Sequence, residues 1–225
     1  MNIITIARHP VTFDGETAQI GTAGELAIAL DVLQGNHDRE VLEQLRPHLA
    51  DIVAGPQGLF AVLRSLSRDD QIFLLDAIGP RLADVVQEPR YLRDIFATMA
   101  HAEVEEKLLN TLGSAGLQQL ILTAEELAEV MEWLYGQCDQ LALDLLGPDY
   151  LRGLFHDGDE LALVLRALDN ARQKYLLDVI GWERVAALVD EGRDLAQPLR
   201  ALPPDASQRL LSHYSRDRLV QLIGN

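Results

Sequence analysis

The sequence predicts an all-α protein, an α-solenoid of about six helical repeats of 33–35 residues, preceded by a short β-hairpin-like cap. Three observations predict it. A leucine recurs at a nearly fixed spacing, each of these leucines begins the same apolar pattern, and glycine or proline residues separate the units. We therefore expect two regions, an N-terminal cap or arm over residues 1–23 and a single repeat domain over residues 24–225.

The N-terminal region has the pattern of two strands. Ile3–Ala7 and Val11–Phe13 are β-prone, and Asp14-Gly15 followed by Glu16–Ile20 is typical of a strand, a turn and a second strand. We expect this hairpin to cover the apolar face of the first repeat, because the terminal unit of a solenoid needs a cap. The alternative is an exposed strand edge that pairs with a partner or with a second copy, giving a homodimer through the hairpin.

The repeat is defined by six leucines at spacings of 33, 33, 35, 34 and 34 residues. Apolar residues follow each of them by four and by seven positions, which places three apolar side chains on one face of a helix. A second apolar pair, such as Leu74-Leu75, and a third patch, such as Leu82-Val85-Val86, predict two further short helices, or one helix if the two fuse through the glycine between them. Helices this short are marginal alone, so neighbouring units must cover each other. The six leucines are Leu26, Leu59, Leu92, Leu127, Leu161 and Leu195.

Two more positions recur after the second apolar pair of each unit. One holds Gly79, Gly113, Gly147 and Gly181, where glycine suits a left-handed C-cap or a tight turn. The other, three residues earlier, is mostly acidic, and we expect it to cap a helix or to pair with an arginine of a neighbouring repeat, such as Arg64, Arg166 or Arg200. The alternative is a ladder of carboxylates that faces a basic ligand. The acidic position holds Glu43, Asp76, Asn110, Asp144, Asp178 and Ser212.

The last repeat carries a resemblance. Its pattern of Leu195, Leu199, Leu202-Pro203-Pro204 and Leu210-Leu211 resembles the acidic N-terminal helical domain of bacterial magnesium transporters and its armadillo-like relatives in the flagellar switch. The membrane span and the nucleotide-binding modules that accompany the transporter domain are missing here. The resemblance therefore implies only an armadillo-like or HEAT-like architecture, in a bacterial protein.

The charge balance limits the partners. Acidic residues outnumber basic ones 35 to 19, for a formal charge of −16, which argues against binding to nucleic acid or to an anionic membrane. No apolar run approaches the ~18 residues of a membrane span, and the single cysteine, Cys138, favours a reducing, cytoplasmic location. No histidine pair, phosphate loop or nucleophile motif is present, so we expect no enzyme activity, metal or cofactor.

The middle of the chain is the most acidic part. Residues 101–165 hold 13 acidic and 2 basic residues together with several aromatic ones. A solvated face is the simplest interpretation; the alternative is a surface that binds a basic partner through acids and aromatic anchors. Asp157 or Asp159 in the same region is expected to cap a helix, and Trp182, at a predicted helix start, is expected at the surface. The candidate partner-binding residues are Glu125, Glu126, Glu129, Glu132, Trp133, Tyr135 and Asp144.

Three functions follow from these patterns. The first is a non-catalytic interaction or scaffold module whose acidic helical surface binds a basic or extended segment of another protein. The second is a regulatory domain in which divalent cations bridge carboxylates of adjacent repeats. The third is an acidic mimic of nucleic acid that occupies the groove of a DNA-binding protein.

Overall fold

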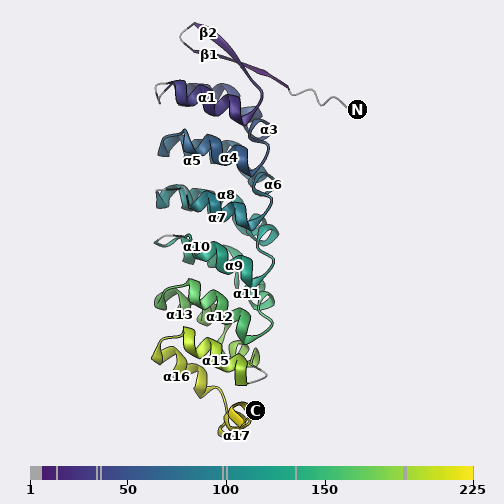
Figure 1. The fold of residues 1–225 in the computed structure, drawn as a ribbon, viewed down its shortest axis with the longest axis vertical. Coiled ribbons are helices and arrows are strands. Elements are labelled where there is room, and N and C mark those ends of the chain that lie inside the picture. Colours follow the sequence, from purple (N-terminus) through teal and green to yellow (C-terminus); the bar gives the residue numbers. More distant parts are fainter. Residues whose placement is uncertain are drawn as a thin grey trace, which may run out of the picture. The chain divides into compact units, whose positions relative to one another are not determined.

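The computed structural model describes residues 7–224 except 14, 34, 36, 98, 100, 135, 190 and 191. The described chain is mostly helical and carries one two-stranded antiparallel hairpin near its N-terminal end (Figure 1). The predicted all-α class with an N-terminal hairpin is confirmed. The chain divides into two compact units, Met1–Gly116 and Leu117–Asn225, with the division inside helix α8 (Ala102–Leu120).

The hairpin consists of β1 (His9–Phe13) and β2 (Glu16–Ile20), with Val11 opposite Ala18. Val11 and Ile20 are buried, which gives the hairpin one apolar face. β1 packs against helix α2 (Asp38–Leu45), where the side-chain amide of Gln44 accepts a hydrogen bond from the Thr12 N–H and donates one to the Thr12 carbonyl, both at 2.9 Å. Residues 3–6 of the predicted first strand lie outside the described residues.

Unit 1 continues with short helices that follow one another in sets of three. The first helix α1 packs on the first helix of the next set, α4, and the third helix α3 contacts α4, α5 and α6. Bounds are α1 (Ala23–Leu33), α2 (Asp38–Leu45), η1 (Arg46–His48), α3 (Leu49–Val53), α4 (Pro56–Arg64), α5 (Arg68–Ile78), η2 (Gly79–Arg81), α6 (Leu82–Val86) and α7 (Pro89–Phe96).

Unit 2 shows the same order of elements. The first helices α9, α12 and α15 pack successively on one another, and the predicted repeat leucines Leu127, Leu161 and Leu195 are buried there. Its helices are α9 (Ala124–Met131), α10 (Cys138–Leu146), α11 (Pro148–Leu154), α12 (Gly158–Ala167), α13 (Asn170–Ile180), α14 (Trp182–Ala187), α15 (Gly192–Ala201), α16 (Pro204–Ser212) and α17 (Arg216–Gly224).

The recurrent glycines adopt a backbone conformation that only glycine tolerates. Gly147 has φ 80° and ψ 157°, and Gly181 has φ 92° and ψ 127°. The φ angles are positive, as in a left-handed cap, but the ψ angles are extended, so the expected left-handed cap is wrong. The requirement for glycine is confirmed, because other residues disfavour a positive φ. The extended ψ lets the third helix begin at the very next residue, Pro148 or Trp182.

A buried or half-buried polar position also recurs, three residues before the apolar pair of each second helix. The amide N–H of Gln71 donates to the Leu63 carbonyl at 2.8 Å, and that of Gln173 donates to the Leu165 carbonyl at 2.7 Å. Both carbonyls lie in the last turn of a first helix, where main-chain acceptors lack intrahelical partners. The position is occupied by Asp38, Gln71, Glu105, Asp139, Gln173 and Ser207, at spacings of 33 or 34 residues.

Asp38 places a carboxyl group where Gln71 and Gln173 have an amide. Its side chain is 1% exposed, and within the described residues its Oδ1 has no hydrogen-bond partner. Burial raises the pKa of the Asp38 carboxyl, the negative charge of Asp70 raises it further, and the N–H of Gly35 lowers it. The charged form of Asp38 therefore destabilises the folded chain.

The glycine geometry generates a first prediction. Gly181→Ala should lower the free energy of unfolding by about 1–3 kcal/mol, because alanine disfavours the observed backbone angles. Gly153→Ala is the matched control: Gly153 lies inside α11 with open space at its Cβ position, so alanine should stabilise the helix by about 0.5–1 kcal/mol. Urea unfolding followed by circular dichroism measures both; equal effects of the two changes would contradict the argument.

The buried carboxyl generates a second prediction. Because the folded-state pKa of Asp38 is raised, its unfavourable contribution appears as the pH rises through the ordinary aspartate pKa. The melting temperature of Asp38→Asn relative to the native chain should therefore increase between about pH 3 and about pH 7. Asp84→Asn, at an exposed position of α6, is the control and should show no such trend. A difference for Asp38→Asn that is independent of pH would refute the assignment.

Candidate protein-binding surface

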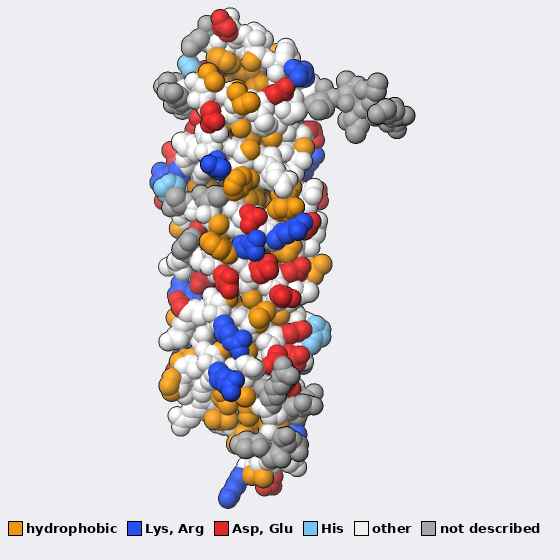
Figure 2. Space-filling view, in the orientation of Figure 1, with side chains coloured by type: hydrophobic (Ala, Val, Ile, Leu, Met, Phe, Trp, Pro, Cys, Tyr) orange, Lys and Arg blue, Asp and Glu red, His pale blue; other side chains and the backbone are white. Residues whose placement is uncertain are grey.

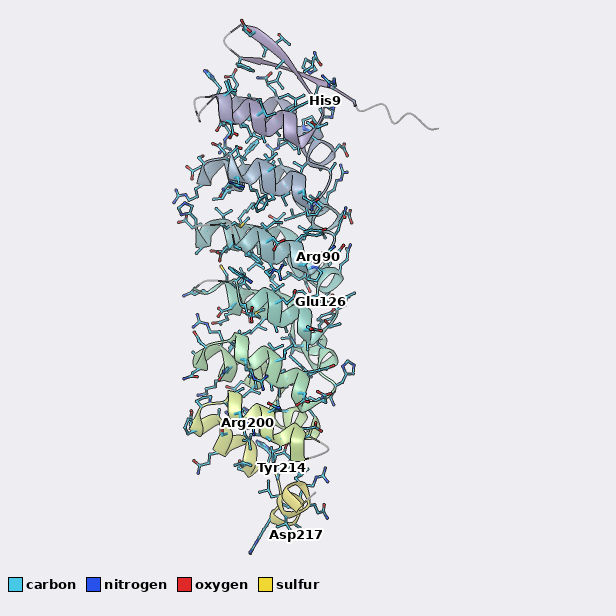
Figure 3. The ribbon with its side chains drawn as sticks, viewed as in Figure 1. His9, Arg90, Glu126, Arg200, Tyr214 and Asp217 are labelled. Atoms are coloured by element: carbon cyan, nitrogen blue, oxygen red, sulfur yellow. The ribbon has the colours of Figure 1, made fainter. Side chains whose placement is uncertain are left out.

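Helix α9 carries most of the predicted binding residues, and its first turn is fixed by a capping box. The Thr123 hydroxyl accepts a hydrogen bond from the Glu126 N–H at 3.2 Å, and Glu126 Oε2 accepts from the N–H groups of Leu122 at 2.7 Å and Thr123 at 3.0 Å. Figure 3 labels Glu126 at this end of α9. The carboxylate of Glu126 is thus bound to the main chain at the helix start.

The same arrangement occurs at the start of other first helices. Glu25 Oε2 accepts from the Gly21 N–H at 2.9 Å, and this hydrogen bond is the main reason that the pKa of Glu25 lies below its usual value. Glu160 accepts from the His156 N–H at 2.8 Å, and Asp157 accepts from the Glu160 N–H at 2.8 Å. The predicted capping role of Asp157 is confirmed, and Glu126 belongs to this structural series.

Three other glutamates of the predicted set lie on one face of the chain around α9. Glu125, Glu129 and Glu132 are spaced by four and three residues, which is the spacing of one helix face. Glu125 and Glu132 are exposed and Glu129 is half-buried. In the part of the chain that the structure describes, none of the three carboxylates takes part in an ion pair or a hydrogen bond. Within the described part of unit 2, no cation neutralises their negative charge.

Of the remaining predicted residues, Trp133 and Asp144 are described and Tyr135 is not. Trp133 is half-buried and lies just after the end of α9. Its main-chain N–H donates a hydrogen bond to the Val130 carbonyl at 3.2 Å. Asp144 lies on α10 and accepts a hydrogen bond from the Tyr175 hydroxyl of α13, which raises the pKa of Tyr175. Tyr135 lies outside the described residues.

An exposed leucine lies on the helix that packs against α9. Leu163 of α12 occurs 34 residues after Glu129, at the equivalent position of the next repeat, and its side chain is 38% exposed. Helices α9 and α12 are in close contact. Acidic, basic and hydrophobic side chains are interspersed on the face shown in Figure 2, so the acidic charge does not form a continuous surface there.

The recurrent acidic position is used mainly for contacts between successive repeats. Asp76 pairs with Lys107 at 2.8 Å, and Asp178 pairs with Arg209 at 3.1 Å, in each case 31 residues later. The hydrogen bond from Lys107 is the main cause that lowers the pKa of Asp76. Asp76 and Asp178 thus pair with a basic residue about one sequence period later, as expected, but not with the expected arginines.

The partners proposed for that position from the sequence are wrong. The Arg166 guanidinium donates to the Gln197 side chain at 2.5 Å, and the Arg64 guanidinium lies over the Phe60 ring at 5.6 Å. Both arginines lie on first helices, whereas Lys107 and Arg209 lie on second helices, next to the second helix that bears the acid. Sequence spacing alone could not show whether the acid meets the first or the second helix of the neighbouring set.

The expectation that Trp182 lies at the surface is also wrong. Its side chain is buried, and its indole N–H donates to Asp178 Oδ1 at 2.7 Å. The Arg209 guanidinium lies 4.4 Å from the centre of the indole ring, and the His213 ring stacks at 6.2 Å. Residues at the C-terminal end of α16 thus cover the tryptophan, although it begins a helix as predicted.

Unit 1 contains a groove that the sequence patterns did not predict. It lies between α4 and α7 and has a volume of about 380 Å³. The only signal in the sequence is that Phe60 and Tyr91 are aromatic at positions that are small or charged in several other repeats. Its wall is mainly apolar, with two polar side chains at the rim. The lining residues are Pro56, Gln57, Phe60, Tyr91, Asp94, Ile95 and Ala97.

Other kinds of site find little support in the described ranges. No group of three or more histidine, cysteine or acidic side chains is arranged there to hold a metal ion. None of the helices described is both long and apolar enough to span a bilayer. No protein-family model, curated protein or solved structure matches the chain.

Proposed function

We propose that the chain is a non-catalytic interaction or scaffold module that binds a basic or extended segment of another protein on the acidic face of α9. The observation that carries the proposal is that Glu125, Glu129 and Glu132 lie on one face without a counter-ion among the described residues. Other acids of unit 2, such as Asp139 and Asp178, are paired with arginines. Lysine or arginine side chains of a partner would relieve the remaining repulsion.

The apolar residues next to this face support a partner that has apolar side chains as well as basic ones. The exposed Leu163 and the half-buried Trp133 offer contact area beside the glutamates. Interfaces gain most of their affinity from such apolar and aromatic contacts, while exposed charges set the rate and the orientation of binding. A basic segment with one or two apolar side chains fits both features.

The architecture that we propose for this module is an armadillo-like or HEAT-like α-solenoid of about six repeats over residues 24–225, in a cytoplasmic protein. Recurrent hydrogen bonds in unit 2 support it. The side chains of Tyr150, Arg184 and Arg218, each 34 residues apart, donate to the main-chain carbonyls of Ile121, Phe155 and Val189, each 29 residues earlier. Such regularity is expected when equivalent residues of successive repeats meet in the same way.

The binding proposal predicts a specific loss of affinity. The triple variant Glu125→Lys, Glu129→Lys and Glu132→Lys should bind a fluorescent peptide of alternating lysine and leucine at least about tenfold more weakly than the native chain, because attraction becomes repulsion. Fluorescence anisotropy at low salt measures the affinity. The native affinity should also fall at about 500 mM salt, where exposed charges are screened.

A charge-matched control separates the α9 face from net charge. Glu183→Lys, Asp205→Lys and Asp217→Lys change the same number of acidic residues in unit 2, all three exposed, but lie on α14, α16 and α17. This control should bind the peptide nearly as well as the native chain. Equal losses of peptide affinity in the two triple variants would show that affinity depends on net charge alone, and would refute the α9 site.

The repeat architecture predicts that a whole unit can be removed. A chain that lacks residues 158–191 joins Asp157 to Gly192, which occupies the position of Gly158 in the next repeat. It should remain helical and unfold cooperatively in urea, with an m-value lower by roughly a sixth, because less surface is exposed on unfolding. An unfolded product would show that the units are not equivalent repeats.

A further inference from the structure

The two edges of the hairpin differ in how their main-chain groups are used. On β1, the N–H and carbonyl of Thr12 point away from β2 and are both bonded to the side chain of Gln44. Pro10 occupies the other outward position of β1 and has no N–H to offer. The outer edge of β1 is therefore closed to a further strand.

The outer edge of β2 is open. Opposite residues of an antiparallel pair direct their main-chain groups in the same sense, either toward or away from each other. Thr17 lies opposite Thr12 and Gln19 lies opposite Pro10, so the N–H and carbonyl groups of Thr17 and Gln19 point outward. Both residues are exposed, and within the described residues no hydrogen bond reaches these four groups.

We propose that β2 is a homodimer interface, in which it pairs antiparallel with β2 of a second copy about an axis at Ala18. In this register Thr17 of each copy lies opposite Gln19 of the other. Each such pair exchanges two main-chain hydrogen bonds, so all four outward groups of each copy are used. The two hairpins then form one four-stranded sheet.

The sequence of β2 fits a second copy in this register. Glu16 is the only charged residue of Glu16–Ile20, and it comes to lie opposite Ile20 of the second copy, so no like charges are opposed. A register shifted by two residues would leave one of the outward pairs unused. In a chain of net charge −16, this nearly uncharged edge is a place where two copies can approach without opposed charges. The contact is small, so we expect a weak dimer.

Sedimentation velocity over a micromolar to millimolar concentration series tests the proposal. The native chain should show a concentration-dependent monomer–dimer equilibrium, and Gln19→Pro should weaken it at least about tenfold, because proline removes an outward donor and obstructs the edge. Gln19→Thr keeps the main-chain donor and should still dimerise. A native chain that stays monomeric throughout, or a dimer that Gln19→Pro leaves unchanged, would overturn the interface.

A second measurement needs no variant. In a concentration series of amide spectra, the N–H signals of Thr17 and Gln19 should shift as the dimer forms, whereas that of Thr12, already bonded to Gln44, should stay in place. Unchanged Thr17 and Gln19 signals, or equal shifts throughout unit 1, would overturn the proposal. Circular dichroism of Gln19→Pro checks that the variant is folded. The outcome is independent of the α9 experiments, since the two surfaces share no residue.

Discussion

Short helices that cannot be stable alone impose the main constraint on this structure. Most helices have 5–11 residues, and such lengths are marginal in water even for favourable sequences. First helices therefore pack on one another, α1 on α4 in unit 1 and α9, α12 and α15 in unit 2, and side chains reach main-chain carbonyls 29 residues earlier in the chain. The buried polar residues follow from the same constraint, because the many helix ends leave acceptors that the core must satisfy.

This constraint also determines which charges remain for binding. Many acids are used for pairing between successive repeats, as Asp76 is with Lys107, or for helix starts, as Glu126 is with the main chain of Leu122 and Thr123. The glutamates of the α9 face have no such structural use among the described residues. A net charge of −16 alone indicates little about a partner, whereas a local set of unpaired acids beside an exposed leucine indicates where a basic segment would bind.

The hairpin has a different structural role, which is to cover apolar residues at the N-terminal end of the helices of unit 1. Val11 and Ile20 are buried on its one apolar face, and Gln44 closes the edge of β1 by imitating a neighbouring strand. Natural sheets usually protect both edges against unwanted pairing. The contrast between a closed β1 and an open β2 is what makes a defined self-association through β2 a reasonable consequence of the fold.

The sequence by itself determined the helical class, the hairpin, the period and the glycine turns, because these depend on local propensity and on spacing along the chain. It also indicated the capping role of Asp157. Only the tertiary structure decided that Trp182 is buried, that Asp178 pairs with Arg209, that Glu126 is bound at a helix start and that a groove lies beside Phe60 and Tyr91. The physical reason is that these features depend on which helix faces meet, and a one-dimensional period does not specify the rotation of one helix against the next.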